Sequence, residues 1–548
     1  MSEPVLKVKD FTVEFWVDGV WYPAAVTMNF EVNPGQVLAI VGESGSGKST
    51  TAMGLMSLLA SNARMSGSVK VKGQEMLGAK GSTLRKFRGK EVAYIFQEPM
   101  TALNPVYTIG FQIIETLRAH FDMGPKEAHT RAVELIKLVD IPDPEKSINK
   151  YPHQLSGGQR QRAMIAQALA CDPGLLIADE PTTALDVTVQ AEILDLMRDL
   201  KDKLSSAILL ITHDMGVVAD MADEILVMKD GITVERGTSE QIFSNPKHPY
   251  TQSLLASVPK LGSSKLRVLE IAPNTAPVLK LENVTIEYPK RGRIPAFTAV
   301  KNFNLEIYPG EIVGLVGESG SGKTTIGRAS IGLLPIKEGK IEIVGRDISH
   351  ASQKELSQIR RHTGIVFQDP ASSLNPRLPI GESIGEPLYL AGIAKGAALA
   401  KRVEELLEQV ELPRSYRNRF PHELSGGQRQ RIGIARALAL TPELLIADEP
   451  TSALDVSVQA RFLDLLQELQ GKLNFACLFI SHDLAVVDIL SHRIAVMQNG
   501  VLVETGTRDQ ILKNPQNAYT RHLLSAVPVP DPTEQRIRRE ARLAASAK

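Results

Sequence analysis

The sequence is a tandem repeat, and this constrains its fold more than any other feature. The stretch GESGSGKST at Gly42–Thr50 returns as GESGSGKTT at Gly317–Thr325. The stretches FQEP, LSGGQRQR and LLIADEPT follow the first copy and return after the second, in the same order, as FQDP, LSGGQRQR and LLIADEPT. Repetition on this scale predicts one type of domain present twice. The expected organisation is a first domain over residues 1–259, a linker over 260–277, a second domain over 278–528 and a tail over 529–548.

Each copy alternates short apolar runs with longer amphipathic stretches. The first copy contains the runs QVLAIVG, VAYIF, LLIAD and AILLIT, which lack polar alternation, as strands buried on both faces do. The stretch TVQAEILDLMRDLKDKL between two of these runs predicts a helix. This alternation predicts the α/β class, with a mostly parallel sheet covered by helices. Between FQEP and LSGG, segments such as PKEAHTRAVELIKLV predict a separate helical subdomain in each copy.

Composition excludes several classes of protein. The 62 basic and 62 acidic residues give no net charge, whereas nucleic-acid binders usually show a basic excess. The start of the chain lacks the apolar region of a secretory signal, and no run approaches the ~18 apolar residues of a membrane span. Cys171 and Cys477 match aliphatic residues, Leu440 and Ile208, in the other copy. We expect both to be small core side chains rather than disulfide, redox or metal sites.

The repeated glycine-rich stretch matches the phosphate-binding pattern G-x-x-x-x-G-K-[ST], and in each copy it follows a predicted strand. Its glycines let backbone N–H groups surround phosphate oxygens, and the following helix N-terminus adds a positive dipole end. Lys48 is expected to reach the β- and γ-phosphates and Ser49 to ligate Mg²⁺. Lys323 and Thr324 match them in the second copy.

Acidic residues end the LLIAD run of each copy. Asp179 and Asp448 are placed to hold Mg²⁺ at the end of a strand. Glu180 and Glu449 follow directly and are placed to polarise an attacking water as general bases.

The LSGGQRQR stretch predicts the start of a helix. Ser156 is a natural N-cap, and the two glycines that follow permit close backbone approach. A helix N-terminus is a second anion-binding surface. Each copy therefore carries two phosphate-binding surfaces, and these residues alone do not decide whether the two serve one nucleotide or different ones.

Taken together, these motifs resemble the nucleotide-binding subunits of ATP-binding cassette (ABC) transporters, over nearly the full length and in both copies. The match covers the phosphate loop, the glutamine of FQEP and FQDP, the LSGGQ signature, LLIADEP, the ALD stretch and the histidine of THD and SHD. The resemblance implies two tandem P-loop NTPase domains, each with a RecA-like core, an antiparallel β subdomain and a helical subdomain. It also implies that ATP lies between the phosphate loop of one cassette and the signature of the other, so that one chain forms both composite sites.

The resemblance assigns residues to each site by motif. The first site would combine Gly42, Ser44, Gly45, Gly47, Lys48, Ser49, Thr50, Gln97, Asp179, Glu180 and His213 with Ser425, Gly427 and Gln428. The second would combine Gly317, Ser319, Gly320, Gly322, Lys323, Thr324, Thr325, Gln368, Asp448, Glu449 and His482 with Ser156, Gly158 and Gln159. Mg²⁺ would be held by Ser49, Gln97 and Asp179 in one site and by Thr324, Gln368 and Asp448 in the other.

The remaining assignments concern the adenine and the γ-phosphate. Phe15 and Tyr288 fit the position at which the family stacks an aromatic ring on adenine. Within the family, His213 and His482 would contact the γ-phosphate and act with Glu180 and Glu449 in catalysis. Because both glutamates and both histidines are intact, we expect two hydrolytically competent sites.

Two further stretches resemble the dipeptide, oligopeptide and nickel importer branch of the family. These are FQEPMTALNP with FQDPASSLNP, and NPKHPYTQSLLASVP, which returns as NPQNAYTRHLLSAVP. Asn517 and Ala518 replace His248 and Pro249, so we expect the role of that pair to be confined to the first copy. The overall plan resembles fused dual-cassette subunits of bacterial peptide importers of the microcin-C (Yej-like) type. Relatives with an iron–sulfur centre carry a cysteine cluster after this segment, and this chain has none there, so no such cluster is expected.

The resemblance implies an ATP-hydrolysing subunit that powers import of peptides or related small solutes. Its partners would be two transmembrane permease subunits and, indirectly, a periplasmic solute-binding protein, but no nucleic acid. Its place would be peripheral, at the cytoplasmic face of the bacterial inner membrane. The solute stays open among peptides, peptide antibiotics, glutathione, opines and sugars.

Two other functions are disfavoured. A tandem-cassette translation factor would need a long, charged helical linker, whereas the linker over residues 260–277 is short. An exporter engine is disfavoured by the segment around HPYT. The tail DPTEQRIRREARLAASAK carries five basic and three acidic residues and predicts a solvated, frayed helix, with a contact to lipid headgroups or a permease as the alternative.

Overall fold

The computed structural model describes residues 3–183, 185–262, 264, 266, 269–290, 292, 295–369, 373–452 and 454–546. Parts of four predicted stretches lie outside these residues: Ala184 and Ala453 of the ALD motifs, Pro370, Ala371 and Ser372 after FQD, Ser263, Lys265, Arg267 and Val268 of the linker, and Ala547 and Lys548 of the tail. The chain forms two compact units. The first unit comprises Met1–Leu185, Val189–Val258 and Pro528–Lys548, and the second comprises Asp186–Thr188 and Pro259–Val527.

The first unit is built around a six-stranded sheet in the order β10-β9-β3-β8-β7-β6. Its strands pair in parallel except for β10, which is antiparallel to β9. Every residue of β3, β7 and β8 is buried, which confirms the strands predicted from unalternated apolar runs. The bounds are β3 (Val37–Val41), β6 (Val92–Ile95), β7 (Leu175–Asp179), β8 (Ala207–Ile211), β9 (Glu224–Lys229) and β10 (Ile232–Thr238).

A four-stranded antiparallel sheet in the order β2-β1-β4-β5 accompanies it. Its strands are β1 (Leu6–Val17), β2 (Val20–Val32), β4 (Ala63–Val71) and β5 (Gln74–Glu75). Alternate residues of the central strands separate into two cores. Leu38 and Ile40 of β3 pack with Phe11 and Phe30 of the antiparallel sheet. Their neighbours Val37, Ala39 and Val41 face the other core, which is formed with helices.

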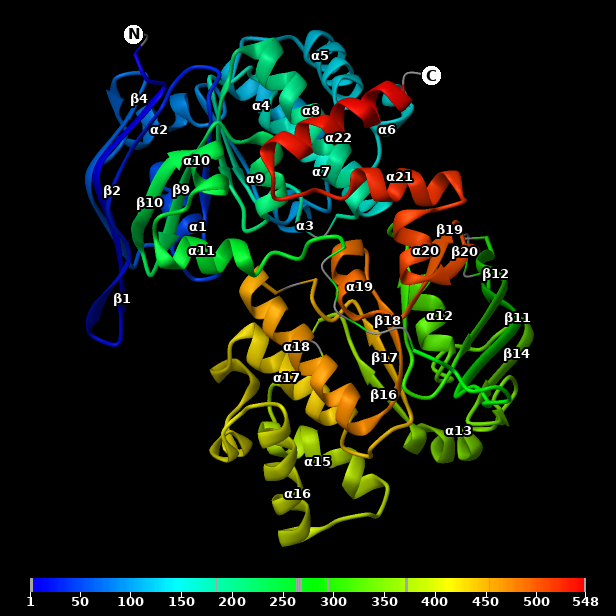
Figure 1. Ribbon diagram of the computed structural model, residues 1–548. Coiled ribbons are helices and arrows are strands. Elements are labelled where there is room, and N and C mark those ends of the chain that lie inside the picture. Colours follow the sequence, from blue (N-terminus) through cyan, green and yellow to red (C-terminus); the bar gives the residue numbers. More distant parts are fainter. Residues whose placement is uncertain are drawn as a thin grey trace. The chain divides into compact units, whose positions relative to one another are not determined.

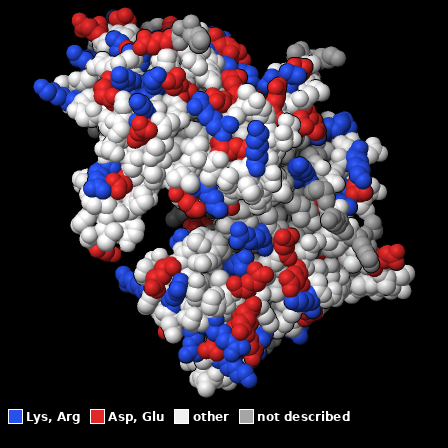
Figure 2. Space-filling view, turned by 60° about the vertical axis from the view of Figure 1, so that its left-hand side comes forward, with Lys and Arg blue, Asp and Glu red and all other residues white. Residues whose placement is uncertain are grey.

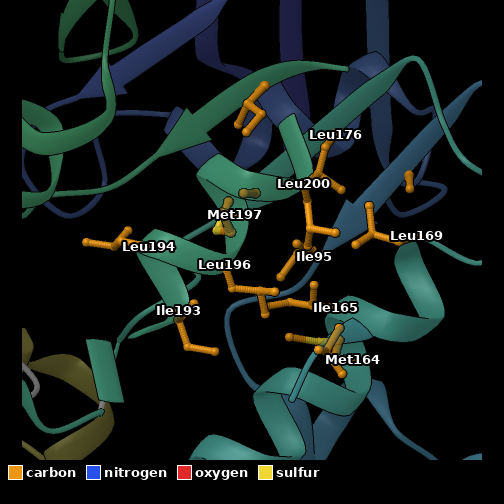
Figure 3. Packing of buried hydrophobic residues seen from close by; sticks show 14 of the residues in the cluster. Ile95, Met164, Ile165, Leu169, Leu176, Ile193, Leu194, Leu196, Met197 and Leu200 are labelled. Atoms are coloured by element: carbon orange, nitrogen blue, oxygen red, sulfur yellow. The ribbon is translucent and has the colours of Figure 1, made fainter. Parts of the chain in front are cut away.

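The helix-side core joins strand and helix residues that are far apart in the sequence. Figure 3 shows Ile95 and Leu176 from strands β6 and β7 among side chains of the helices. Met164 and Ile165 come from the helix that follows LSGG, and Leu196 and Leu200 come from the helix predicted after LLIAD. The LSGG helix is therefore anchored by its apolar side, which leaves its N-terminus available at the surface.

The helices of the first copy agree with the predicted pattern. The segment between β6 and β7 is largely helical, as expected from the region between FQEP and LSGG. The bounds are α1 (Lys48–Leu55), α2 (Gly81–Phe87), α3 (Pro99–Ala102), α4 (Ile109–His120), α5 (Pro125–Leu138), α6 (Pro144–Ser147), η1 (Pro152–Gln154), α7 (Gly157–Ala168), α8 (Val187–Leu204), α9 (Met215–Met221), α10 (Ser239–Ser244) and α11 (Pro249–Ala256).

The second unit repeats this architecture, with sheets in the orders β12-β11-β14-β15 and β16-β17-β18-β13-β19-β20 (Figure 1). Its strands are β11 (Leu279–Tyr288), β12 (Phe297–Ile307), β13 (Ile312–Val316), β14 (Glu338–Ile343), β15 (Arg346–Asp347), β16 (Thr363–Val366), β17 (Leu444–Asp448), β18 (Ala476–Ile480), β19 (Arg493–Gln498) and β20 (Val501–Thr507). Its helices are α12 (Lys323–Ala329), α13 (Gln353–Ile359), η2 (Arg360–His362), α15 (Ile380–Leu390), α16 (Gly396–Gln409), η3 (Arg414–Asn418), η4 (Pro421–Glu423), α17 (Gly426–Ala437), α18 (Val456–Leu473), α19 (Leu484–Leu490), α20 (Arg508–Lys513) and α21 (Ala518–Ala526).

The two cysteines are core residues, as predicted. Both are buried and neither forms a disulfide. Burial raises the pKa of the Cys171 thiol to about 11, and it raises that of Cys477 further. Both therefore stay protonated near neutral pH and serve as small apolar side chains.

The C-terminal helix α22 (Pro532–Ser546) is not a solvated tail. It belongs to the first unit, where it packs against α9 and α10 and is drawn in red beside them in Figure 1. Arg542 lies 2.6 Å from a carboxylate oxygen of Asp195, and Arg539 lies 3.1 Å from one of Asp220. Arg198 bridges the same two carboxylates at 2.9 Å each. The expectation of a solvated helix was wrong because both acidic partners lie more than three hundred positions upstream.

The surface offers no field of a single sign on the face shown in Figure 2, where acidic and basic side chains are interspersed. This matches the balanced composition. Within the described ranges, no helix combines the length and the hydropathy that crossing a bilayer requires.

The docked tail gives the first prediction. Because the Arg542 side chain is only 8% exposed, Arg542→Met should remove a partly desolvated ion pair and cost about 1–2 kcal/mol of stability. Arg538→Met is the matched control, since Arg538 pairs with Glu534 of α22 itself and, among the described residues, with no other acidic side chain. The control should change stability by less than about 0.5 kcal/mol. Hydrogen exchange should become faster in α9 in the first variant only; equal exchange in both would contradict the docking.

Candidate functional site

The glycine-rich stretch of the first copy forms the loop between β3 and α1. A Cβ on Gly42 would lie 2.2 Å from the carbonyl oxygen of Met228, so only glycine fits there. Gly47 has φ of 95° and lies equally close to the Ala24 carbonyl, which a Cβ would meet at 2.1 Å. These contacts fix the path of the loop around the buried Lys48.

Lys48 is folded back onto the loop that precedes it. Its ammonium donates hydrogen bonds to the carbonyl oxygens of Gly42 and Glu43, at 2.8 and 2.9 Å. The second unit repeats this contact, with Lys323 donating to Gly317 and Glu318 at the same two distances. Burial lowers the pKa of Lys323, and the surrounding carboxylates act in the opposite direction.

The predicted magnesium ligands of the first copy are adjacent. The hydroxyl of Ser49 donates to Oδ1 of Asp179 at 2.9 Å, and the hydroxyl of Tyr94 donates to Oδ2 at 2.8 Å. Burial raises the pKa of Asp179, although both hydrogen bonds act to lower it. Hydroxyl and carboxylate oxygens are the ligands that Mg²⁺ prefers, so the side chains present fit this ion.

The second copy differs at this point. Thr324 donates to Oδ1 of Asp448 at 2.8 Å, as Ser49 does to Asp179. Ile365 occupies the strand position of Tyr94, and the guanidinium of Arg328 lies 4.0 Å from Oδ2 of Asp448 instead. Comparison of the two copies in the sequence could have found this exchange of a phenol for a cation.

The glutamate after each aspartate adopts an unusual backbone conformation. Glu180 has φ of 48° and Glu449 has φ of 46°. A left-handed conformation costs a residue with a side chain about 1–3 kcal/mol and is characteristic of functional sites. Here it turns each carboxylate toward polar neighbours that the resemblance also assigns to the site.

These neighbours come from the ends of the adjacent strands. Gln97, after β6, donates to Oε2 of Glu180 at 2.7 Å, and Nδ1 of His213, after β8, lies 3.0 Å from Oε1. In the second unit, Gln368 donates to Oε2 of Glu449 at 3.0 Å, and Nδ1 of His482 lies 3.3 Å from the same oxygen. The predicted catalytic residues thus meet at the carboxyl edge of each parallel sheet, where open α/β sheets bind ligands.

Glu180 and His213 shift each other's pKa. Burial acts to raise the pKa of Glu180, but the hydrogen bond and charge of His213 lower it overall. Burial likewise acts to lower the pKa of His213, and the hydrogen bond and charge of Glu180, with Asp214, raise it overall. The same balance holds for Glu449 and His482. Each pair is therefore an ion pair over a wider window of pH than the ordinary pKa values of a glutamate and a histidine would give.

The LSGGQ signature begins a helix, as predicted. Ser156 Oγ accepts from the Gln159 amide, and Gln159 Oε1 accepts from the Ser156 amide, both at 3.2 Å. This reciprocal capping box is repeated by Ser425 and Gln428. The second of the two glycines in this motif is required by packing. A Cβ on Gly158 would lie 2.6 Å from Val189, and one on Gly427 would lie 2.4 Å from Val458.

The two predicted adenine-stacking aromatics lie in corresponding strands. Tyr288 ends β11, and its hydroxyl lies 3.3 Å from Oγ1 of Thr325, directly after the second phosphate loop. Phe15 lies on β1, partly buried against the core beneath the antiparallel sheet.

The second unit also contains three residues that come from the first copy in sequence, Asp186–Thr188. Asp186 Oδ2 accepts a hydrogen bond from the Ser319 amide at 3.2 Å, and Thr188 donates to Glu318 at 3.0 Å. Ser319 and Glu318 belong to the second phosphate loop. The ALD stretch signalled these residues, but the sequence did not identify their partners.

Two tyrosines in the segment around HPYT, Tyr250 and Tyr519, also reach the sites and were not predicted from the sequence. The Glu43 amide donates to the hydroxyl of Tyr250 at 3.0 Å, and the Glu318 amide donates to that of Tyr519 at 3.1 Å. Both tyrosines therefore contact a phosphate loop. The only signal in the sequence is that each follows the replaced residue pair at the same spacing.

The expectation that the role of His248 is confined to the first copy was wrong. His248 Nδ1 accepts from the Tyr250 amide at 3.2 Å and so caps helix α11. Asn517 Oδ1 accepts from the Tyr519 amide at 2.8 Å and caps helix α21 in the same way. Asparagine is itself a favoured N-cap, so the substitution preserves the function.

Comparison with known proteins agrees with this geometry. The model of the ABC transporter family matches residues 26–183 and 300–452, and that of the oligopeptide/dipeptide transporter C-terminal region matches 234–283 and 503–547. The glutathione import ATP-binding protein GsiA of Escherichia coli strain K12 is 47% identical, over 98% of this chain and 91% of the relative. The protein of the same name from Salmonella paratyphi A is 46% identical, over 98% and 92%.

This chain is also similar to solved structures over part of its length. The ATP-binding cassette MJ0796 bound to ADP and Pi is 35% identical and covers 42% of this chain and 98% of its own, with a TM-score of 0.38. The family models and the full-length relatives decide the assignment: this chain belongs to the ABC transporter family, as an ATPase of the oligopeptide/dipeptide importer branch.

Proposed function

We propose that this chain powers the import of a small peptide-like solute, with glutathione as the first candidate, by hydrolysing ATP at two sites. The observation that carries the proposal is likeness over 98% of the chain to glutathione import ATP-binding proteins. Two catalytic clusters that retain glutamate, histidine and glutamine support it. Glutathione is a tripeptide, so this solute falls within the peptide class expected from the sequence.

Each copy acts as one nucleotide-binding domain, over 1–259 and 278–528, and ATP is shared between the phosphate loop of one and the signature of the other. The contacts of Asp186 and Thr188 with the second phosphate loop support this arrangement, because residues of one copy then contribute to the loop of the other. The capped N-termini of α7 and α17 supply the second anion-binding surface for each nucleotide.

The phosphate groups are bound by charge and by backbone amides. Lys48 and Lys323 exchange their carbonyl contacts in the loop for the β- and γ-phosphates. Mg²⁺, held by Ser49, Gln97 and Asp179 or by Thr324, Gln368 and Asp448, neutralises charge on the phosphates when bound. Phe15 and Tyr288 stack on the adenine.

Glu180 and Glu449 orient the attacking water. Their lowered pKa keeps both carboxylates ionised at neutral pH. A carboxylate of low pKa polarises and aligns a water rather than removing its proton in advance, which suits a loose phosphoryl-transfer transition state. His213 and His482 hold these carboxylates in place and reach the γ-phosphate when it is present.

Two permease subunits provide the membrane path, and the chain binds them peripherally at the cytoplasmic face of the inner membrane. Exposed apolar side chains on both sides of the glutamine of the first copy support this, because such surfaces mark protein interfaces. They are Phe96, Met100, Val106, Tyr107 and Phe111, of which Val106 is 70% exposed. A periplasmic binding protein delivers the solute to the permeases, and no iron–sulfur cluster takes part.

Transport is tested by replacement of a relative. A bacterial strain that lacks its own glutathione import ATP-binding subunit should regain uptake of radiolabelled glutathione when it expresses this chain. A competing dipeptide in excess distinguishes general peptide import from glutathione import. Failure to restore uptake, together with failure of this chain to co-purify with the permeases, would contradict the proposal.

The base assignment gives the second prediction. The double variant Glu180→Gln and Glu449→Gln should lose at least about 100-fold in hydrolysis rate and retain ATP binding, because only the polarising charge is removed. The control Glu91→Gln changes a half-buried glutamate that pairs with Lys72 outside the candidate site, and it should keep full turnover. Phosphate release and filter binding measure the two quantities; sustained turnover in the double variant would refute the assignment.

The composite arrangement gives the third prediction, measured as occluded ATP per chain in the Glu180→Gln and Glu449→Gln background. Lys48→Ala should remove one of two occluded nucleotides. Adding Ser425→Arg should remove no more, since it damages the same site, whereas adding Ser156→Arg should remove the second. The opposite pattern would show that each copy encloses its own nucleotide.

The ion pair gives the fourth prediction. Its stabilising contribution is present above the lowered pKa of Glu180 and is lost as pH rises through the raised pKa of His213. In Glu180→Gln, burial acts without the carboxylate, so the pKa of His213 should fall below 6.5. NMR titration of histidine-labelled chain, assigned with His213→Asn, measures this. An unchanged titration would mean that Glu180 does not hold the proton on His213.

A further inference from the structure

The segment around HPYT is connected to each phosphate loop through one peptide group. The peptide that joins Gly42 to Glu43 offers its N–H to the hydroxyl of Tyr250 at 3.0 Å. Its carbonyl, that of Gly42, accepts from the ammonium of Lys48 at 2.8 Å. One rigid, planar group therefore lies between a tyrosine hydroxyl and the lysine.

The second copy builds the same bridge from its own residues. The peptide that joins Gly317 to Glu318 donates to Tyr519 at 3.1 Å, and its carbonyl accepts from Lys323 at 2.8 Å. Tyr519 is buried, which together with the nearby carboxylates raises the pKa of its hydroxyl to about 12. The hydroxyl thus stays neutral over the working range of pH and remains an acceptor for the amide.

A series of hydrogen bonds fixes the helix that carries each tyrosine. Glu235 on β10 accepts from the amides of Lys247 and His248, at 2.7 and 3.0 Å, and His248 caps the helix that carries Tyr250. In the second copy, Glu504 likewise accepts from the amides of Gln516 and Asn517. Asn517 then caps the helix that carries Tyr519. The cap residue differs between the copies, but the position of the hydroxyl does not.

We propose that Tyr250 and Tyr519 are positioning residues that set the phosphate loops, and with them Lys48 and Lys323, for nucleotide binding. Each hydroxyl fixes the peptide plane on which the lysine rests, so the ammonium starts from a defined place when phosphate arrives. The inference rests on the proposed function in one respect, that these loops bind ATP. The ligand is still ATP. The segment of each copy that carries the tyrosine controls the affinity of the phosphate loop for ATP.

The kinetic signature follows from when the contact acts. The lysine contacts phosphate both in the bound state and in the transition state, so a displaced loop weakens both equally. The KM for ATP should therefore rise while kcat changes little. A tyrosine that only stabilised the fold would instead lower the fraction of active protein, which lowers the apparent kcat and leaves the KM unchanged.

The test isolates one site at a time in the full chain. In a Lys323→Ala background, a fluorescent ATP analogue is titrated with Mg²⁺ against Tyr250→Phe, which removes only the hydroxyl and keeps the ring over which Lys229 lies. We expect affinity to fall about 3- to 10-fold, the net effect of one hydrogen bond. Gln252→Leu is the matched control, because it removes a hydrogen bond to Pro246 within the same segment but away from the loop. It should stay within twofold of the background.

The second copy and the catalytic readout complete the test. Tyr519→Phe in a Lys48→Ala background should show the same loss, with Arg521→Leu as its control, since Arg521 bonds to Pro515 and Gln516 only within the segment. With both lysines intact, the double tyrosine variant should show a KM raised several-fold and a kcat within about twofold.

The outcomes separate the two proposals. Unchanged affinity in the tyrosine variants, or a lower binding stoichiometry at unchanged affinity, overturns the positioning role. If Lys48→Ala in the Lys323→Ala background also leaves binding unchanged, the phosphate loops themselves are misassigned and the proposed function fails with it.

Discussion

Burial of the central strands on both faces is the constraint on which the sites depend. Alternate residues of β3 go to two different cores, so the strand cannot slip in register by one residue without exchanging its two faces. Its end is thereby fixed, and so is the start of the phosphate loop that follows. The ends of β7 and β8 are fixed by the same packing, which brings the aspartate, glutamate and histidine to one edge. The geometry of the candidate site therefore follows from core packing.

The two copies share this frame but differ in chemistry at the aspartate that we propose holds Mg²⁺. Asp179 accepts from a neutral phenol, whereas Asp448 has a guanidinium nearby. A neutral donor and a cation perturb a carboxylate differently, since only the cation contributes a net charge to the site. Two sites with the same motifs therefore need not bind Mg²⁺ with equal affinity. In this respect the two copies differ, although both keep the aspartate, glutamate, glutamine and histidine of the motifs.

Much of this could be predicted from the sequence, and the exceptions have a common physical cause. The strands, the signature helix with its Ser156 cap and the adjacency of Ser49 to Asp179 all follow from local pattern or from motif order. The contact of Tyr250 with Glu43 and the docking of Arg542 on Asp195 do not. Both join residues far apart in the chain through side chains with no periodic signature. Such contacts are set by tertiary packing, which a motif does not encode. His248 and Asn517 show the converse, because two different residue types cap corresponding helices.

The path of the chain has a consequence for biosynthesis. The first unit combines residues that the ribosome makes before the second copy with residues that it makes afterwards, Pro528–Lys548. Its N-terminal part is finished while the whole second copy is still to be translated, a delay of roughly 15–60 s at typical bacterial elongation rates. During that interval Asp195 and Asp220 have Arg198 as a partner but lack Arg542 and Arg539 of α22. Loss of Pro528–Lys548 would therefore affect the half of the protein that is made first.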